Sequence, residues 1–139
     1  MTNFRDGAIN GLSRSKAKAK PYPSGPEAKK LACNYLLKQG LRLLCRNYRT
    51  KRGEIDLIMQ DADVLVFVEV RFRKTDRFGS AEESITRQKC ERLQAADKAY
   101  LQFRSPDSSI AVRFDAVALS PDVNKQGGIA INWVQNFLN

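Results

Sequence analysis

The stretch Gly53–Ile58, which has the sequence GEIDLI, and the stretch Val64–Phe72, which has the sequence VLVFVEVRF, decide how this chain is expected to fold. Both are short apolar runs next to polar turn residues, a pattern that predicts two neighbouring strands. Asp56 interrupts the first run and Glu69 the second. An isolated charge inside a buried strand is costly, so such a carboxylate must be paired, protonated or bound to a metal. The two acids therefore predict a site for a hard cation.

Alternation of side chains along a strand predicts where these acids lie. Glu54, Asp56 and Ile58 are expected to share one face of the first strand, and Glu69 lies on one face of the second. The turn between them falls at Asp61–Asp63. A loop with an even number of residues places Asp56 opposite Glu69. An odd loop without a bulge sends the acids to opposite faces, because a slip of one residue reverses every side chain.

Composition indicates a basic protein with one folded domain. The 139 residues are 42% hydrophobic, enough to bury a core. A net charge of +9 and a pI near 9.7 favour a polyanionic partner, nucleic acid first and an anionic membrane surface second. A basic surface around an acidic centre suits a metal-dependent enzyme that acts on phosphodiesters. The alternative is a basic domain whose charges face water.

Several classes of protein are excluded. The chain has no histidine, which excludes Ser-His hydrolases, histidine-based zinc sites and nucleases with a histidine base. Its three cysteines, Cys33, Cys45 and Cys90, form no CxxC pair, and the N-terminus lacks the apolar segment of a secretory signal. Reduced thiols and a cytoplasmic location are expected. No apolar run approaches the roughly 20 residues of a membrane span, so no membrane association is expected.

The chain divides into a basic arm at residues 1–22 and a single α/β domain at residues 23–139. The arm is predicted to be disordered, either as a solvated extension or as a non-specific phosphate-binding tail. Ser24 and Glu27 form a capping-box pattern, which predicts a helix that ends at Gln39 before Gly40. The remaining patterns predict a second helix at 87–103. They also predict strands at 42–48, 54–60, 64–72, 113–119 and 129–134. The order αβββαββ predicts a mixed central sheet flanked by helices.

Several of these motifs occur together in a known family. Residues 24–137 resemble the YraN-like family of small bacterial proteins (uncharacterised protein family 0102). The resemblance rests on Glu27, Asn47–Arg49, Gly53–Ile58, Val66–Val70, Gly79, Lys89 and Arg113–Asp115. That family is similar to the restriction-endonuclease-like fold, especially the archaeal Holliday-junction resolvases, which carry a PD-(D/E)xK constellation on the central sheet. The resemblance implies a restriction-endonuclease-like sandwich and a metal-dependent DNA endonuclease that acts on branched or structured DNA.

The resemblance also implies roles for individual residues. Asp56 matches the first acid, Glu69 matches the second, and the carbonyl of Val70 is implied as a third metal ligand. Glu27 matches a helix-borne acid of the resolvases, although a capping role is the alternative. Two carboxylates and a main-chain oxygen suit Mg²⁺ or Mn²⁺. Such an ion would polarise the scissile phosphate and lower the pKa of an attacking water.

One position departs from the nuclease pattern. Arg71 stands two residues after Glu69, where the pattern has lysine. Arginine stays charged and cannot act as a base, but it can stabilise negative charge on the phosphate. Lys89, near the start of the second predicted helix, is a candidate substitute. Two alternatives therefore stay open: a nucleic-acid-binding module on a nuclease-like scaffold without turnover, and a basic domain that docks an acidic protein.

The remaining predictions concern residues around this centre. The backbone of the nucleic acid is expected to contact Arg49, Lys51, Arg52, Arg73 and Lys74. Glu54 is a supporting residue or a cross-strand partner of Arg71. Arg113 and Asp115 are expected to have a surface or edge role, and Trp133 to lie in the core or an interface. The resolvase likeness implies a possible homodimer.

Overall fold

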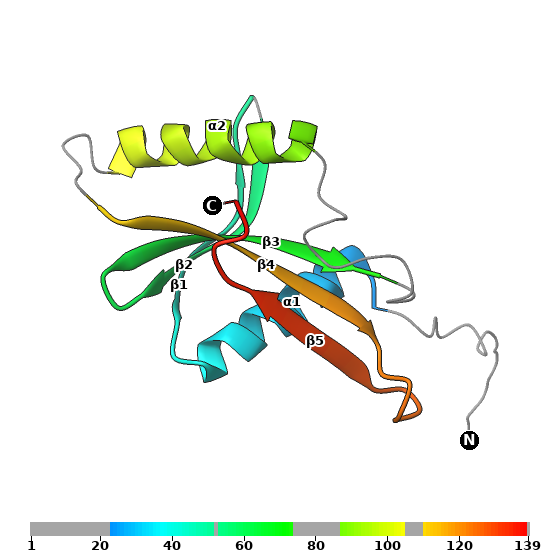
Figure 1. Cartoon of the computed structure of the whole chain (residues 1–139). Helices are drawn as coiled ribbons and strands as arrows, with labels where there is room; N and C mark the ends of the chain where they lie inside the picture. The colour runs from blue at the N-terminus through cyan, green and yellow to red at the C-terminus, as the bar shows by residue number, and fades with distance from the viewer. Residues whose placement is uncertain (1–22, 52, 74–86, 105–109, 139) are drawn as a thin grey trace, which may run out of the picture.

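A computed structural model describes residues 23–51, 53–73, 87–104 and 110–138. In this part of the chain a five-stranded sheet lies between two helices, α2 above it and α1 below it in Figure 1. The elements are α1 (Gly25–Lys38), β1 (Arg42–Arg49), β2 (Glu54–Asp61), β3 (Val64–Phe72), α2 (Arg87–Arg104), β4 (Val112–Pro121) and β5 (Ile129–Val134). The predicted order αβββαββ and the helix-flanked sheet are confirmed. The predicted arm, Arg52, Lys74 and Gly79 lie outside the described residues.

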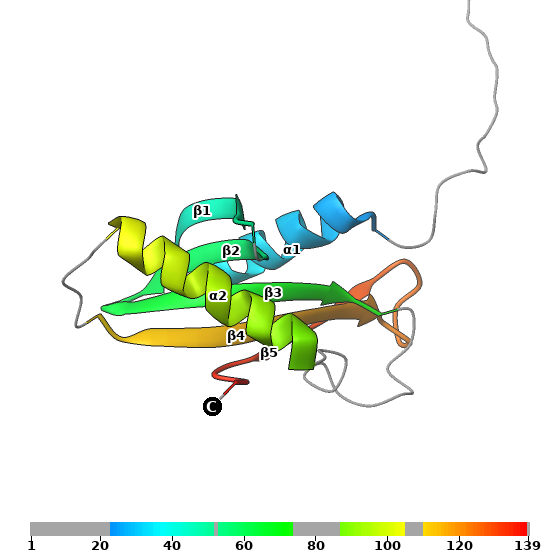
Figure 2. The same ribbon diagram turned by 90° about the horizontal axis from the view of Figure 1, so that it is seen from above.

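The sheet is mixed, as predicted. Its strand order is β1-β2-β3-β4-β5, and β3 and β4 are parallel while every other neighbouring pair is antiparallel. Parallel neighbours need a long crossover, which suits the position of α2 between β3 and β4 in the sequence. Figure 2, seen from above, shows α2 crossing over the strands.

Each helix covers one face of the sheet and closes a separate apolar core. The first core joins α1 to the sheet; its fully buried members include Ala32, Leu36, Leu57, Val66, Val68 and Val117. The second joins α2 to the sheet; its buried members include Ile55, Ile58, Phe67, Leu93, Ala96 and Tyr100. β3 contributes alternate residues to the two cores, as expected for a strand buried on both faces.

The ends of α1 follow from local sequence. Ser24 is the N-cap, and its hydroxyl oxygen accepts a hydrogen bond from the amide of Glu27 at 3.2 Å. In return the Ser24 amide donates to Glu27 Oε1 at 2.7 Å, which completes the predicted capping box. The helix stops before Gly40, whose φ of 101° suits glycine because it has no Cβ.

The turn between β2 and β3 sets the register of the central hairpin. Asp61 pairs with Val64, so the loop consists of residues 62 and 63 alone. Ala62 at the first loop position has a φ of 53°, the left-handed conformation that tight hairpin turns require. The loop is therefore even, and the paired register ends at Leu57↔Val68, one step before positions 56 and 69.

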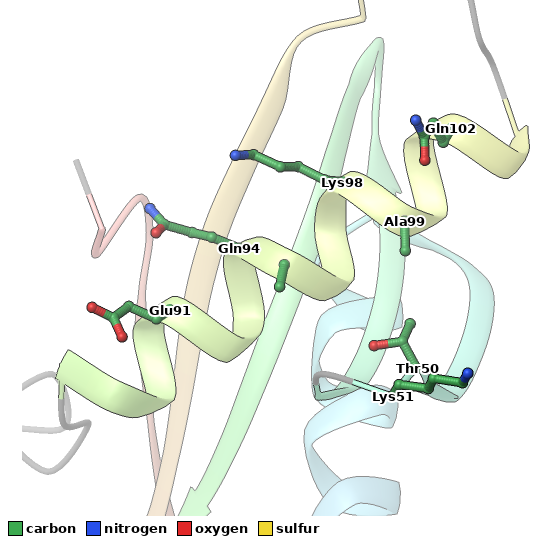
Figure 3. A pocket seen from close by; sticks show the side chains of 8 residues that line it. Thr50, Lys51, Glu91, Gln94, Lys98, Ala99 and Gln102 are labelled. Atoms are coloured by element: carbon green, nitrogen blue, oxygen red, sulfur yellow. The ribbon is translucent and has the colours of Figure 1, made fainter.

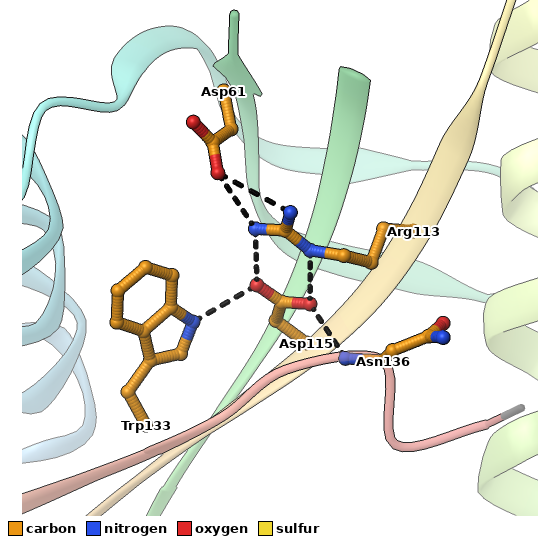
Figure 4. A network of polar contacts seen from close by, with 5 residues as sticks. All are labelled: Asp61, Arg113, Asp115, Trp133 and Asn136. Carbon is orange, nitrogen blue, oxygen red and sulfur yellow. Dashed lines mark hydrogen bonds and ion pairs between the residues drawn. The ribbon is translucent and has the colours of Figure 1, made fainter.

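Asp115 and Arg113 form a buried network, so the predicted surface or edge role was wrong (Figure 4). Asp115 is fully buried, and both of its oxygens accept hydrogen bonds from Arg113, at 2.9 and 3.0 Å. The indole of Trp133 and the main-chain amide of Asn136 also donate to this carboxylate, each at 2.9 Å. β4 is an inner strand between β3 and β5, which explains the burial. Trp133 packs against the α1-side core, as predicted.

The same network ties two distant turns to β4. The guanidinium of Arg113 also donates to Asp61 Oδ2 at the end of β2, through two nitrogens at 3.2 Å each. The hydrogen bond to Asp115 is the main cause that raises the pKa of Arg113 above its usual value. Arg113 therefore links the β2–β3 turn to the residues that follow β5.

Candidate functional site

Asp56 and Glu69 lie where β2 and β3 separate. The ladder between these strands runs from the turn to the pair Leu57↔Val68. Beyond it, β2 continues to pair with β1 and β3 continues to pair with β4. One further step in the β2/β3 register places position 56 opposite position 69. We call this place the fork.

Asp56 is held at the fork by two groups from different elements, the Val70 amide of β3 and the Lys29 ammonium of α1. Its side chain is buried, and Oδ2 accepts a hydrogen bond from the main-chain amide of Val70 at 2.8 Å. Its Oδ1 lies 3.3 Å from Nζ of Lys29 in α1, and the same ammonium donates to Asn47 Oδ1 at 2.8 Å. Because Val70 follows Glu69 directly, the amide bond fixes the Asp56 carboxylate beside the Glu69–Val70 peptide.

The simple alternation predicted for β2 is interrupted at Asp56. Asp56 contacts α1, whereas Ile58 packs in the α2-side core, so the two do not share a face as predicted. Ile55 and Leu57 likewise pack on opposite faces although they are two residues apart. The cause lies across the ladder at Asn47, whose φ of 51° breaks the extended conformation of β1. Asparagine tolerates this left-handed conformation better than most residues.

Glu69 lies on the other side of the fork, towards α2. It is 1% exposed, and Arg71 Nη1 approaches its Oε2 at 3.8 Å. Burial raises the pKa of the Cys90 thiol, and the negative charge of Glu69 raises it further, which places Glu69 near the first turns of α2. Lys89 precedes Cys90 in α2, but its side chain lies outside the described part of the structure.

The oxygen donors at the fork are of the chemical type that binds a hard divalent cation. Two carboxylates and the main-chain carbonyl of Val70 are oxygen ligands, the type that Mg²⁺ and Mn²⁺ take. Among the residues that the structure describes, no group of three or more His, Cys, Asp or Glu side chains is placed to hold a metal. Any ion would therefore keep several water ligands, as Mg²⁺ commonly does.

Glu27, the implied helix-borne ligand, is exposed and engaged in the capping box. Hydrogen bonds from Ser24, chiefly from its main chain, lower the pKa of Glu27. We expect Glu27→Gln to leave both the thermal midpoint and any cation affinity unchanged, because glutamine also completes a capping box. Circular dichroism melts and Mn²⁺ titration measure the two quantities. A loss of cation affinity at unchanged stability would assign Glu27 to the metal site instead.

A small cavity opens beside Asp56, between the first turns of α1 and the β1–β2 ladder. Its volume is about 210 Å³, and its lining includes Lys29, Lys30, Arg46, Asn47 and Asp56. A carboxylate thus lies among three cationic side chains. We call this the α1–β1 cavity.

A larger cavity of about 570 Å³ lies between α2 and the β1–β2 turn (Figure 3). Lys51, which the sequence predicts to bind nucleic acid, lines it together with Lys98, Glu91 and the amide side chains of α2. Two cationic side chains and one carboxylate line it, whereas three cationic side chains and one carboxylate line the α1–β1 cavity. The larger cavity is therefore less suited to an anion than the α1–β1 cavity.

Two other predicted backbone-binding residues, Arg49 and Arg73, lie in the described part of the chain. Arg49 is highly exposed, and its Nε donates to Glu54 Oε2 at 2.9 Å across β1 and β2. This hydrogen bond raises the pKa of Arg49. Arg73 follows β3 and is half-buried. Their contacts with nucleic acid stay a prediction.

Sequence reasoning missed Lys29, whose ammonium the structure places 3.3 Å from Asp56. Lys29, Cys33 and Leu36 follow the helical spacing i, i+4, i+7, so Lys29 lies at the edge of the stripe that faces the sheet. That spacing was the available signal. It shows that the side chain can reach the sheet, but not which carboxylate it meets.

Asp97 in α2 was also missed. Its Oδ1 is buried without a hydrogen-bond partner among the described residues, and burial raises its pKa to about 6. The native state therefore binds this proton more tightly than the unfolded chain does. The resulting stabilisation is present below the unfolded pKa near 3.8 and is lost as the pH rises through about 6.

We expect Asp97→Asn to remove the pH dependence of stability that Asp97 causes. The thermal midpoint of the variant should exceed that of the natural protein at pH 8, where Asp97 is charged, and should match it near pH 4. Melts of both proteins across this range measure the difference. A constant difference at every pH would show that Asp97 keeps its ordinary pKa in the folded protein.

Comparisons with known proteins show the family of this chain. The model of "Uncharacterised protein family UPF0102" matches residues 28–119, which include most of α1, the fork and most of β4. The chain belongs to the UPF0102 family. A UPF0102 protein of Nitrosococcus oceani is 46% identical over 81% of this chain and 88% of its own length. UPF0102 proteins of Vibrio parahaemolyticus and Saccharophagus degradans are 43% and 44% identical over 83% and 85% of the chain, and over 91% and 94% of their own lengths.

Membership confirms the YraN-like resemblance that the sequence motifs indicate. Within the described residues, no helix has the length and apolar character needed to cross a bilayer.

Proposed function

We propose that this UPF0102 protein is a divalent-cation-dependent phosphodiesterase that acts on nucleic acid, with DNA as the preferred substrate. One observation carries the proposal. Asp56 and Glu69 are buried carboxylates at the fork, and the hydrogen bond from the Val70 amide holds Asp56 beside the Glu69–Val70 peptide. Burying acids on neighbouring strands is costly and needs compensation, which a divalent cation would supply in addition to Lys29 and Arg71.

The chain's own residues would share the ligation. The Val70 amide already occupies Asp56 Oδ2, so Oδ1 is the oxygen available to a cation. Its approach requires Lys29 to move from its position 3.3 Å away, and Lys29 is partly exposed. Glu69 and the carbonyl of Val70 would supply the other protein ligands. A bound Mg²⁺ or Mn²⁺ would polarise a phosphate oxygen and lower the pKa of a ligated water.

Arg71 takes a different role from the lysine of the nuclease pattern. Its guanidinium lies near Glu69 and carries a permanent charge, so it would neutralise a phosphate and would not accept a proton. The basic composition suits the same substrate, since the net charge of +9 attracts a phosphate backbone.

Cleavage assays test the proposal. Linear, nicked and four-way DNAs are incubated with the full chain in Mg²⁺, in Mn²⁺ and in EDTA. We expect cleavage that depends on the cation and is lost in Asp56→Asn and Glu69→Gln proteins. Cleavage that persists in both variants would place the activity outside this site.

A second function, nucleic-acid binding without turnover, is favoured by the ion pairs of the fork. Lys29 faces Asp56 and Arg71 faces Glu69, so cations of the chain already offset both acids. In this case binding is salt-dependent and survives Asp56→Asn and Glu69→Gln, and no cation supports cleavage. Cleavage that appears only in an Arg71→Lys protein would support this second function, because lysine restores the nuclease pattern.

A further inference from the structure

The α1–β1 cavity has the chemistry of an anion site. Lys29, Lys30 and Arg46 line it, and Asn47 adds an amide side chain. Lys30 and Arg46 are exposed residues, and the Arg46 guanidinium, whose Nη2 lies 4.0 Å from Cys33 Sγ, keeps further donors for a ligand. Its volume of about 210 Å³ exceeds the space that one tetrahedral oxyanion fills.

Lys29 connects this cavity to the fork. Its ammonium contacts Asp56 at 3.3 Å and Asn47 at 2.8 Å, so it neutralises the carboxylate from within the cavity. A cation bound at Asp56 Oδ1 would take over that neutralisation and release the ammonium. Asn47, in its left-handed conformation, then still anchors Lys29 at the cavity wall.

We propose that the α1–β1 cavity binds one backbone phosphate of the nucleic acid, and that Lys29 transfers from Asp56 to this phosphate. The inference rests on the proposed function and adds a subsite beside the cation position. Lys30 and Arg46 hold the phosphate from the outer side, and Lys29 completes the contact when Asp56 no longer needs it. Occupation of the subsite and neutralisation of Asp56 are therefore coupled, since one lysine serves both anions in turn.

DNA binding without turnover tests the subsite. The anisotropy of a fluorescein-labelled duplex is measured with the full chain in EDTA, over a range of salt concentrations. We expect Lys30→Gln and Arg46→Gln each to weaken binding about tenfold and to lower the slope against the logarithm of salt by about 1. Lys38→Gln, which removes a charge from the exposed last turn of the same helix, is the matched control.

Asp56→Asn tests the transfer of Lys29. Asparagine can still accept the Val70 hydrogen bond but no longer attracts Lys29, so we expect this variant to bind the duplex several-fold more tightly in EDTA. Asp63→Asn makes the same charge change at the exposed β2–β3 turn and should have a smaller effect. Thermal melts of every variant verify folding.

Two results would overturn the inference. One is that Lys30→Gln and Arg46→Gln bind as Lys38→Gln does, and the other is that Asp56→Asn binds no more tightly than Asp63→Asn. The test of the phosphate subsite can succeed or fail independently of the test of the proposed function. If no DNA is cleaved in Mg²⁺ or Mn²⁺ but the variants bind DNA as expected, the proposed hydrolysis is wrong and the phosphate subsite is supported. If DNA is cleaved and the binding pattern fails, the subsite alone is wrong.

Discussion

Replacement of Arg113 by alanine is expected to lower the free energy of unfolding by about 3–5 kcal/mol, because it leaves the Asp115 carboxylate buried without its cation. Asp115 is fully buried, and Arg113 supplies two of its four hydrogen bonds. The variant also loses the link from Arg113 to Asp61. Urea denaturation followed by tryptophan fluorescence measures the loss, since Trp133 is part of the same network.

Two further variants define the cause. Arg49→Ala removes an arginine from an ion pair on the exposed surface, and we expect no measurable change in stability. An Arg113→Met, Asp115→Leu protein removes both buried charges and should recover part of the lost stability. If Arg113→Ala proved as harmless as Arg49→Ala, the buried network would not stabilise the fold.

Asp56→Asn and Glu69→Gln are each expected to reduce the Mg²⁺-dependent cleavage rate by roughly a thousandfold. The estimate assumes that the cation contributes about 4 kcal/mol to the transition state. Both substitutions preserve the volume of the side chain, and asparagine retains an oxygen for the Val70 amide. Single-turnover assays with excess protein separate the chemical step from product release.

The control for this pair is Asp63→Asn. Asp63 is an exposed acid at the opposite end of the β2–β3 hairpin, so its loss should leave the cleavage rate unchanged. If only one of Asp56→Asn and Glu69→Gln lost activity, the two carboxylates would not act on the same ion. Comparable losses in all three variants would indicate a general charge effect.

Local sequence patterns predicted most of the fold. The capping box at Ser24 and the glycine at position 40 define α1, and apolar runs bounded by turns locate β2 and β3. These features depend on contacts between residues close in sequence, which short-range patterns describe well. The sequence left open whether the hairpin loop is even or odd; the structure has an even loop of two residues, and its ladder ends one step before positions 56 and 69.

Contacts between distant elements could not be predicted in the same way. The left-handed conformation of Asn47 interrupts the alternation of β2, and nothing in the spacing of β2 itself signals it. Lys29 reaches Asp56 only because α1 lies across the sheet at that point. Arg113 and Asp115, which are two residues apart on one strand, resemble a surface ion pair until the inner position of β4 is known.

The most direct test of the account is Mn²⁺ binding to the full chain, followed by the loss of the free-ion electron paramagnetic resonance signal. We expect one site in the natural protein, a large loss of Mn²⁺ affinity in both Asp56→Asn and Glu69→Gln, and no loss in Asp63→Asn. Equal Mn²⁺ affinity in the natural protein and in the two fork variants would contradict it.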